Sequence, residues 1–172
     1  MGNRILVCGE NGAGKSTLGA CLAKGLGCPF LDIEDYFFHD KNDYTAPRES
    51  REALRALALD MNRYESWIFA ARKAQYGPEI ENRFTAAVFL AIPKELGVRR
   101  VRQRSFQKFG ERICSGGDLY ERENQFLELV KGRSDRDIRD WLNTLAVGVV
   151  EIDGAKPVEE NIQTLLGIFC GG

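Results

Sequence analysis

The chain has 172 residues, of which 44% are hydrophobic and 28% are charged. This length and balance are typical of one soluble globular domain whose core needs no disulfides or metal ions. The formal net charge of −1 gives no reason to expect bulk attraction to nucleic acid or to an anionic membrane.

Two further patterns bear on where the protein works. No run of about 18 apolar residues is present and the N-terminus lacks the apolar centre of a signal peptide, so we expect no membrane span and no export. The cysteines are odd in number, scattered and without C-x-x-C spacing. We therefore expect reduced thiols, no zinc site and a cytoplasmic protein.

The first part of the chain alternates between strand and helix patterns. The apolar run Arg4–Cys8 predicts a buried strand, and apolar residues at helical spacing predict a helix from Lys15 to about Gly27. Phe30–Ile33 predicts a second strand, and the polar residues 39–47 predict a loop. An apolar face then predicts a helix over Arg48–Asn62.

The rest of the chain continues this alternation. The predicted strands are 67–71, 86–92 and 148–152, and the predicted helices are 94–107, 118–131, 136–145 and 157–169. Strands that alternate with helices predict an α/β fold with a parallel sheet covered on both faces. The stretch 94–140 is too long for a simple crossover, so it predicts a lid-like insertion.

Residues 9–16 match the P-loop, or Walker A, pattern G-x-x-x-x-G-K-[ST] in full. The motif follows a predicted strand and opens a predicted helix, which is the context in which it binds phosphate. Its glycines let backbone amides point inward as an anion nest, Lys15 would reach the outer phosphates, and Ser16 would offer a hydroxyl group to Mg²⁺. The predicted nucleotide-binding residues are Gly9, Asn11, Gly12, Ala13, Gly14, Lys15, Ser16 and Thr17.

Three acidic residues follow the second predicted strand, at the edge where parallel sheets bind ligands. Phosphoryl transfer uses one carboxylate near Mg²⁺ and another that accepts the proton of the acceptor. We expect Asp32 to join Ser16 in the magnesium shell, Asp32 and Glu34 to contact substrate, and Asp35 to be the catalytic base. The third predicted strand lacks the acid that many P-loop proteins carry there, so Mg²⁺ is held either by these acids or mainly by Ser16 and the phosphates.

Six basic residues and a single acidic residue lie between Val98 and Arg112. Such a cluster predicts either a bound anion or acidic side chains from elsewhere in the chain, because like charges repel unless they are neutralised. Arg100 and Arg104 lie on one helix face and are expected to bind nucleotide and to stabilise the transferred group, respectively, and Arg112 lies near a glycine hinge. Arg48, Arg51 and Arg72 are predicted to hold the acceptor, and Gly154 to border the adenine base.

These residues resemble the adenylate kinase and shikimate kinase group of P-loop kinases. The similar stretches are the P-loop, Leu-Asp-Ile-Glu-Asp-Tyr at 31–36, Arg100-x-x-x-Arg104, Phe-Gly-Glu-Arg at 109–112 and Val-Val-Glu-Ile-Asp-Gly at 149–154. The resemblance implies a P-loop NTPase fold with three α/β/α layers and a five-stranded parallel sheet in the order 2-3-1-4-5. It also implies one domain over residues 1–172, an acceptor-binding segment at about 36–62 and a lid at about 105–135, with Arg104 and Arg112 as lid arginines.

The resemblance further implies ATP, Mg²⁺ and transfer of the γ-phosphoryl group. Two departures keep the acceptor open: the third strand lacks the Asp-Gly-x-Pro-Arg of adenylate kinases, and the Asp-x-Asp of shikimate kinases reads Asp32-x-Glu34. We expect a monomeric or homodimeric kinase for a nucleotide, nucleoside or other metabolite, without a membrane or nucleic-acid partner. The alternative is an ATP-binding or ATP-hydrolysing switch that acts on a protein partner.

Overall fold

A five-stranded sheet organises the fold, which a computed structural model describes for residues 2–40 and 43–170. Its strands are β1 (Arg4–Gly9), β2 (Phe30–Asp32), β5 (Trp67–Ala70), β6 (Ala86–Ala91) and β7 (Gly148–Asp153). All neighbours are parallel, in the order β2-β5-β1-β6-β7. Counted along the chain within this sheet, that order is 2-3-1-4-5, which confirms the prediction.

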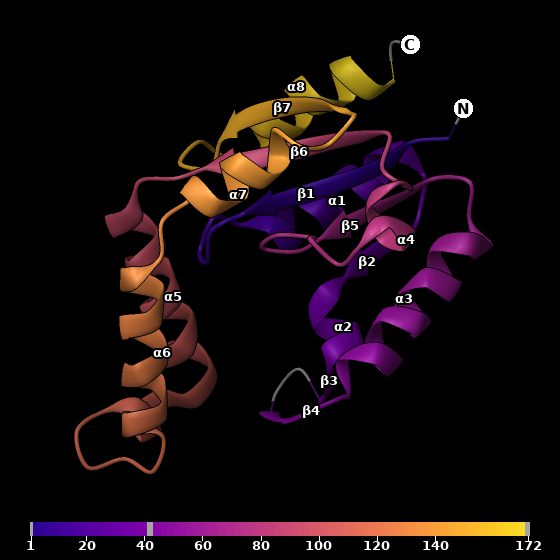
Figure 1. The fold of residues 1–172 in the computed structure, drawn as a ribbon. Helices are drawn as coiled ribbons and strands as arrows, with labels where there is room; N and C mark the ends of the chain where they lie inside the picture. Colours follow the sequence, from indigo (N-terminus) through magenta and orange to yellow (C-terminus); the bar gives the residue numbers. More distant parts are fainter. Residues whose placement is uncertain (1, 41–42, 171–172) are drawn as a thin grey trace.

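Side chains of the central strand β1 alternate between two cores, as the pleat of a strand requires. Ile5 and Val7 pack with α1 (Lys15–Leu26) and α8 (Val158–Phe169) on one face of the sheet. Leu6 and Cys8 pack with α3 (Ser50–Arg63) and α7 (Arg136–Leu142) on the other face. Figure 1 shows helices on both sides of the sheet, so the three-layer α/β/α arrangement is confirmed.

Helices α5 (Lys94–Phe109) and α6 (Tyr120–Gly132) follow β6 and precede β7 in the chain. They lie side by side and project away from the sheet (Figure 1). A 3₁₀ turn (Gly110–Ile113) follows α5 directly. We call residues 94–132 the α5–α6 arm. Val101, near the base of the arm, is buried, whereas Phe106 further along is 51% exposed. The arm includes most of the segment in which the sequence predicts a lid.

The segment between β2 and β5 contains more regular structure than the sequence predicts. Helix α2 (Ile33–Phe37) begins after Asp32, whose Oδ1 accepts a hydrogen bond from the amide of Glu34 at 3.1 Å. Strands β3 (Phe38–Asp40) and β4 (Asp43–Pro47) pair antiparallel. The loop predicted for 39–47 is therefore wrong where the residues are described; residues 41–42 lie outside the described residues. Backbone groups make this pairing, so the polar side chains gave no sign of it.

Smaller features complete the fold. A single helical turn, α4 (Pro78–Glu81), opens with proline and was not predicted. All five cysteines are free thiols. Within residues 2–40 and 43–170, no helix has both the length and the apolar character needed to cross a bilayer.

Candidate functional site

The P-loop connects β1 to α1 at the C-terminal edge of the sheet. Gly12 has a φ of +81°, and a Cβ atom there would collide with the carbonyl oxygen of Gly97 on α5. Gly14 has a φ of +96° and is the N-cap of α1. The motif's glycines are thus required by the shape of the loop, which leads into a helix whose first amides lack helical partners and attract anions.

Lys15 is the first residue of α1, and its side chain turns back over the loop. Nζ donates a hydrogen bond to the carbonyl oxygen of Glu10 at 3.0 Å. Burial, with a smaller contribution from Arg104, lowers the pKa of Lys15 to about 8, against the opposing effects of Glu34 and Glu10. A phosphate group beside Nζ would reverse this shift, because it would supply the opposite charge that the buried ammonium lacks.

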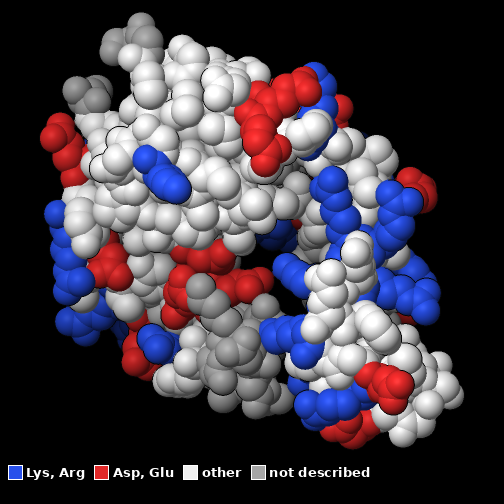
Figure 2. Space-filling model, turned by 180° about the vertical axis from the view of Figure 1, so that it is seen from behind, with Lys and Arg blue, Asp and Glu red and all other residues white. Residues whose placement is uncertain are grey.

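Three adjoining cavities surround the loop. The β7 cavity of about 480 Å³ lies between the P-loop and the β7–α8 connection, the P-loop cavity of about 260 Å³ lies over the loop, and the arm cavity of about 380 Å³ lies between α2, β3 and the arm. The first two share Gly12, Gly14, Thr17 and Arg100, and the last two share Asn11, Glu34 and Arg104. Figure 2 shows the hollow, with acidic side chains gathered on the side of the sheet and basic ones on the side of the arm.

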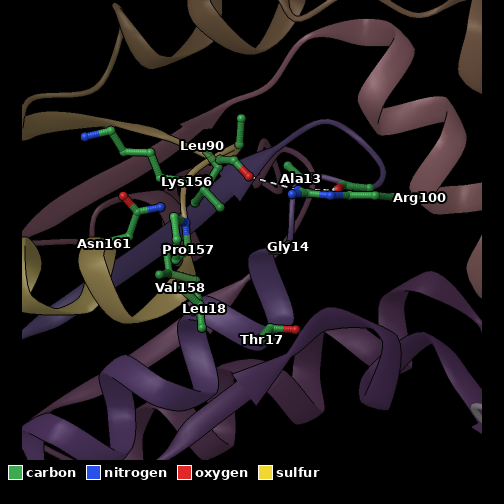
Figure 3. Close-up of a pocket in the computed structure, with 13 residues that line it drawn as sticks. Ala13, Gly14, Thr17, Leu18, Leu90, Arg100, Lys156, Pro157, Val158 and Asn161 are labelled. Carbon is green, nitrogen blue, oxygen red and sulfur yellow. Dashed lines mark hydrogen bonds between the residues drawn. The ribbon is translucent and has the colours of Figure 1, made fainter.

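Arg100 and Gly154, which the sequence predicts to lie near the nucleotide, both line the β7 cavity (Figure 3). Arg100 reaches across from α5, and its Nη1 donates to the carbonyl oxygens of Gly154 at 2.8 Å and Gly12 at 3.4 Å. Buried Asn161 donates from Nδ2 to the carbonyl oxygen of Asp153 at 2.9 Å, which holds the same connection. The apolar walls are Ala13, Leu18, Leu90, Pro157 and Val158. An apolar slot beside a phosphate nest suits a planar base.

The acids after β2 separate into two environments. Asp32 and Glu34 both line the P-loop cavity, whereas Asp35 is exposed on α2 and lines none of the three cavities. Ser16 lines the P-loop cavity with them. The described residues contain no group of three or more His, Cys, Asp or Glu side chains that could hold a metal. Asp32 and Ser16 are the predicted magnesium ligands, and a Mg²⁺ ion held by these two side chains would take its other ligands from phosphate oxygens and water.

Arg104 and Arg112, both predicted to be catalytic, also differ in position. Arg104 lines the P-loop and arm cavities. Arg112 is exposed beyond the end of α5, where Nε and Nη2 donate to Asp118 at 3.0 and 2.6 Å. These bonds hold the pKa of the Asp118 carboxyl group below its usual value. The structure thus places Arg104 at the site and Arg112 away from it.

The arginines predicted to hold the acceptor do not converge. Arg72 lines the P-loop cavity, but its guanidinium group binds Glu10 at 2.6 and 3.1 Å and Asp137 at 2.9 and 3.0 Å. Arg48 lines none of the three cavities, and its buried Nε has no hydrogen-bond partner among the described residues. Arg51 is exposed on α3 beside a separate groove.

Two contacts at the P-loop were not predicted from the sequence. Arg133, which directly follows α6, donates from Nη1 to Oδ1 of Asn11 at 2.9 Å and so ties the end of the arm to the P-loop. Its position where the predicted lid returns to the sheet was the signal that could have revealed it. Glu10 occupies a variable position of the motif, so nothing in the pattern indicates its pairing with Arg72.

Solved structures of kinases share this architecture. Shikimate kinase from Bacteroides thetaiotaomicron aligns with a TM-score of 0.62 at 20% identity, over 96% of this chain and 97% of that one. A gluconokinase from Sinorhizobium meliloti 1021 aligns with a TM-score of 0.59 at 20% identity, over 96% and 90%. The shikimate kinase family model matches residues 11–48, which hold most of the P-loop and the acids after β2. The chain therefore has the fold of the shikimate kinase-like P-loop kinases.

A more similar sequence identifies the family. The uncharacterized protein YqaC of Bacillus subtilis (strain 168) is 32% identical over 174 residues, which cover 96% of this chain and 97% of YqaC. The chain belongs to the same family as YqaC. The resemblance to the adenylate kinase and shikimate kinase group that the sequence indicated is confirmed.

Proposed function

We propose that the protein is an ATP-dependent kinase that transfers the γ-phosphoryl group to a hydroxyl group of a small metabolite. The observation that carries this proposal is the row of three adjoining cavities with the P-loop beneath the middle one. Adenine would occupy the β7 cavity, the phosphates the P-loop cavity and the acceptor the arm cavity, so that donor and acceptor meet as phosphoryl transfer requires. The kinase names of the structural neighbours support a kinase function.

The chain's own residues divide the work of such a reaction. Amides of the P-loop and Lys15 would bind the phosphates, and Arg100 would hold the base and phosphate sites in place. Mg²⁺, held by Ser16 and Asp32 together with the nucleotide, would neutralise phosphate charge. Arg104 lines the P-loop cavity together with Lys15, so it can stabilise negative charge on the transferred group.

Glu34 replaces Asp35 as the proposed base. It lies at the junction of the P-loop and arm cavities, where the hydroxyl group of an acceptor would approach the γ-phosphate. Asp35 is exposed on the next position of α2 and lines neither cavity. Arg112 has no part in this proposal, because it is paired with Asp118 outside the site.

The arm is proposed to act as the lid predicted for about 105–135, and α2 with β3 as part of the acceptor-binding segment predicted for about 36–62. Arm residues supply most of the lining of the arm cavity, and Arg133 joins the end of the arm to Asn11 of the P-loop. Closure of a lid over a kinase site excludes water, which would otherwise accept the phosphoryl group.

The proposal is tested with purified protein, ATP, Mg²⁺ and a broad panel of metabolites. ADP release is measured with and without each compound, and products are identified by ³¹P NMR. We expect one class of compound to raise ADP release by about 100-fold or more, since a positioned acceptor gains from proximity. The Lys15→Met variant should lose this activity. Slow hydrolysis that no compound accelerates, together with a nucleotide-dependent protein partner, would instead support the regulatory switch.

A further inference from the structure

The arm cavity has the position and size of an acceptor site, given the proposed kinase function. Its volume of about 380 Å³ lies in the range of small-molecule pockets, roughly 300–1,000 Å³. It shares Asn11, Glu34 and Arg104 with the P-loop cavity. A molecule bound there can therefore place one group beside the phosphates while the rest of it lies against the arm.

Three phenylalanine residues from three separate elements line this cavity. Phe38 comes from β3, Phe109 from the end of α5 and Phe126 from α6. All three residues are partly exposed. Phenyl rings bind planar apolar surfaces by stacking or by edge-to-face contact, so their convergence indicates a ring as the ligand's main feature.

Two cationic side chains contact the ring of Phe109, which forms part of the cavity wall. The Lys108 ammonium lies 5.1 Å and the Arg122 guanidinium 5.2 Å from the centroid of the Phe109 ring. Arg122 also pairs with Glu123 at 3.1 Å, and the Glu123 side chain is only 13% exposed. Cation–π contacts and this ion pair fix the orientation of the wall, so it is ordered before a ligand binds.

The same lining disfavours two other kinds of acceptor. Three cations line the cavity, but none is left for a phosphorylated acceptor such as a nucleoside monophosphate. Arg122 pairs with Glu123, Lys108 lies against the Phe109 ring, and Arg104 also lines the P-loop cavity, where the phosphates of ATP would lie. A sugar acid has no planar π surface to offer the three phenyl rings, so it would gain less from them than an aromatic ring does.

We infer that the acceptor is an alcohol that carries a planar aromatic or heteroaromatic ring, such as a nucleoside. The ring lies among Phe38, Phe109 and Phe126, and the hydroxyl group lies beside Glu34. In the reaction, the hydroxyl oxygen forms a bond to the γ-phosphorus, and the bond from that phosphorus to the β–γ bridging oxygen breaks. The hydroxyl proton passes to Glu34, and the products are ADP and a phosphate monoester.

The test compares three sets of acceptors under identical conditions with ATP and Mg²⁺. The sets are five nucleosides with two hydroxymethylpyridines, the non-aromatic alcohols shikimate and gluconate, and the nucleoside monophosphates. We expect at least one aromatic alcohol to exceed both other sets by about 100-fold in kcat/KM, as two or three aromatic contacts would provide.

Substitutions of the phenylalanine residues that line the cavity test whether this preference arises there. Phe126→Leu and, independently, Phe109→Leu should raise KM for the aromatic alcohol about 10-fold while changing KM for ATP much less. Phe106→Leu is the matched control, because Phe106 lies on α5, is 51% exposed and does not line the cavity.

The outcomes separate this inference from the kinase function. Preferred phosphorylation of a sugar acid or a monophosphate, or equal effects of Phe126→Leu and Phe106→Leu, would overturn the aromatic acceptor and leave the kinase function intact. Tight ATP binding without phosphorylation of any acceptor would overturn both.

Discussion

Glu34 and Asp35 are neighbours in the sequence, but only Glu34 lines the cavities. We expect Glu34→Gln to lower kcat by about 100-fold or more, since a positioned general base typically contributes 10²–10⁴. KM for ATP should change little, because the substitution keeps the size of the side chain. The measurement is steady-state kinetics with the acceptor that the panel identifies.

Asp35→Asn serves as the comparison for the same experiment. It removes a carboxylate one position away without touching the cavities, so kcat should stay within about threefold of the original value. A kcat loss in Asp35→Asn that matches Glu34→Gln, with both variants folded, would return the role of base to Asp35.

The low pKa of Lys15 predicts how ATP affinity depends on pH. In the free protein burial lowers this pKa to about 8, and bound phosphates would raise it. Affinity should therefore be fully present below pH 8 and fall by up to about tenfold per pH unit above 8, until the higher pKa of the complex is reached. Calorimetric titration between pH 7 and 10 measures this slope.

Lys15→Met removes the titrating group and should give weak ATP binding with little pH dependence over the same range. A slope that persists in this variant would assign the pH dependence to another group. An original protein whose affinity stays constant to pH 10 would show that Lys15 does not contact the phosphates.

Residue positions were predictable where the backbone conformation dictates the residue type. The P-loop positions fall in this class, since Gly12 and Gly14 adopt positive φ that side chains rarely tolerate. Arginines were harder, because a long side chain chooses its partner through tertiary contacts. Arg112 pairs with Asp118 six positions later, and Arg133 contacts a P-loop side chain far away in the sequence.

At the scale of elements, burial decided what could be predicted. β1, β5 and β6 are buried on both faces and read as apolar runs, so their pattern was clear. The hairpin β3–β4 and the helix α2 are short, and a backbone ladder and the Asp32 cap define them. Periodicity carries no signal for elements of three to five residues.

Arg72 connects two elements of the fold, and the contribution of this connection to stability can be measured. It links the P-loop, through Glu10, to α7, through Asp137, and the Glu10 side chain is only 16% exposed. We expect Arg72→Ala to lower the free energy of unfolding by about 1–3 kcal/mol, because it leaves the mostly buried Glu10 side chain without its partner. Urea denaturation measures this change, and ATP affinity should fall with it.

Lys73→Ala is the matched control for Arg72→Ala. Lys73 lies 4.0 Å from Asp137 and belongs to the same connection after β5, but it makes no bond to the P-loop. Its removal should cost less than about 0.5 kcal/mol. Equal losses in the two variants would mean that the contact with Glu10 contributes nothing.

Considered as a whole, the nucleotide site joins three parts of the chain that are far apart in the sequence. The β1–α1 loop, α5 and the β7–α8 connection all line it. Arg100 belongs to α5 and donates hydrogen bonds to the β1–α1 loop and to the β7–α8 connection. A ligand that bridges these parts binds only the folded chain, so it must stabilise the whole molecule against unfolding.

This linkage gives a prediction for the melting temperature. ATP at 100 times its dissociation constant should stabilise the protein by about 2.7 kcal/mol, which corresponds to a rise of roughly 5–10 °C for a chain of this size. Arg100→Ala should reduce the rise by half or more at the same ATP concentration, because the base and phosphate sites lose their shared bond. Arg99→Ala, the exposed neighbour outside the three cavities, should keep the full rise. Thermal scans with and without ATP make the comparison, and an equal rise in both variants would show that Arg100 does not couple the two sites.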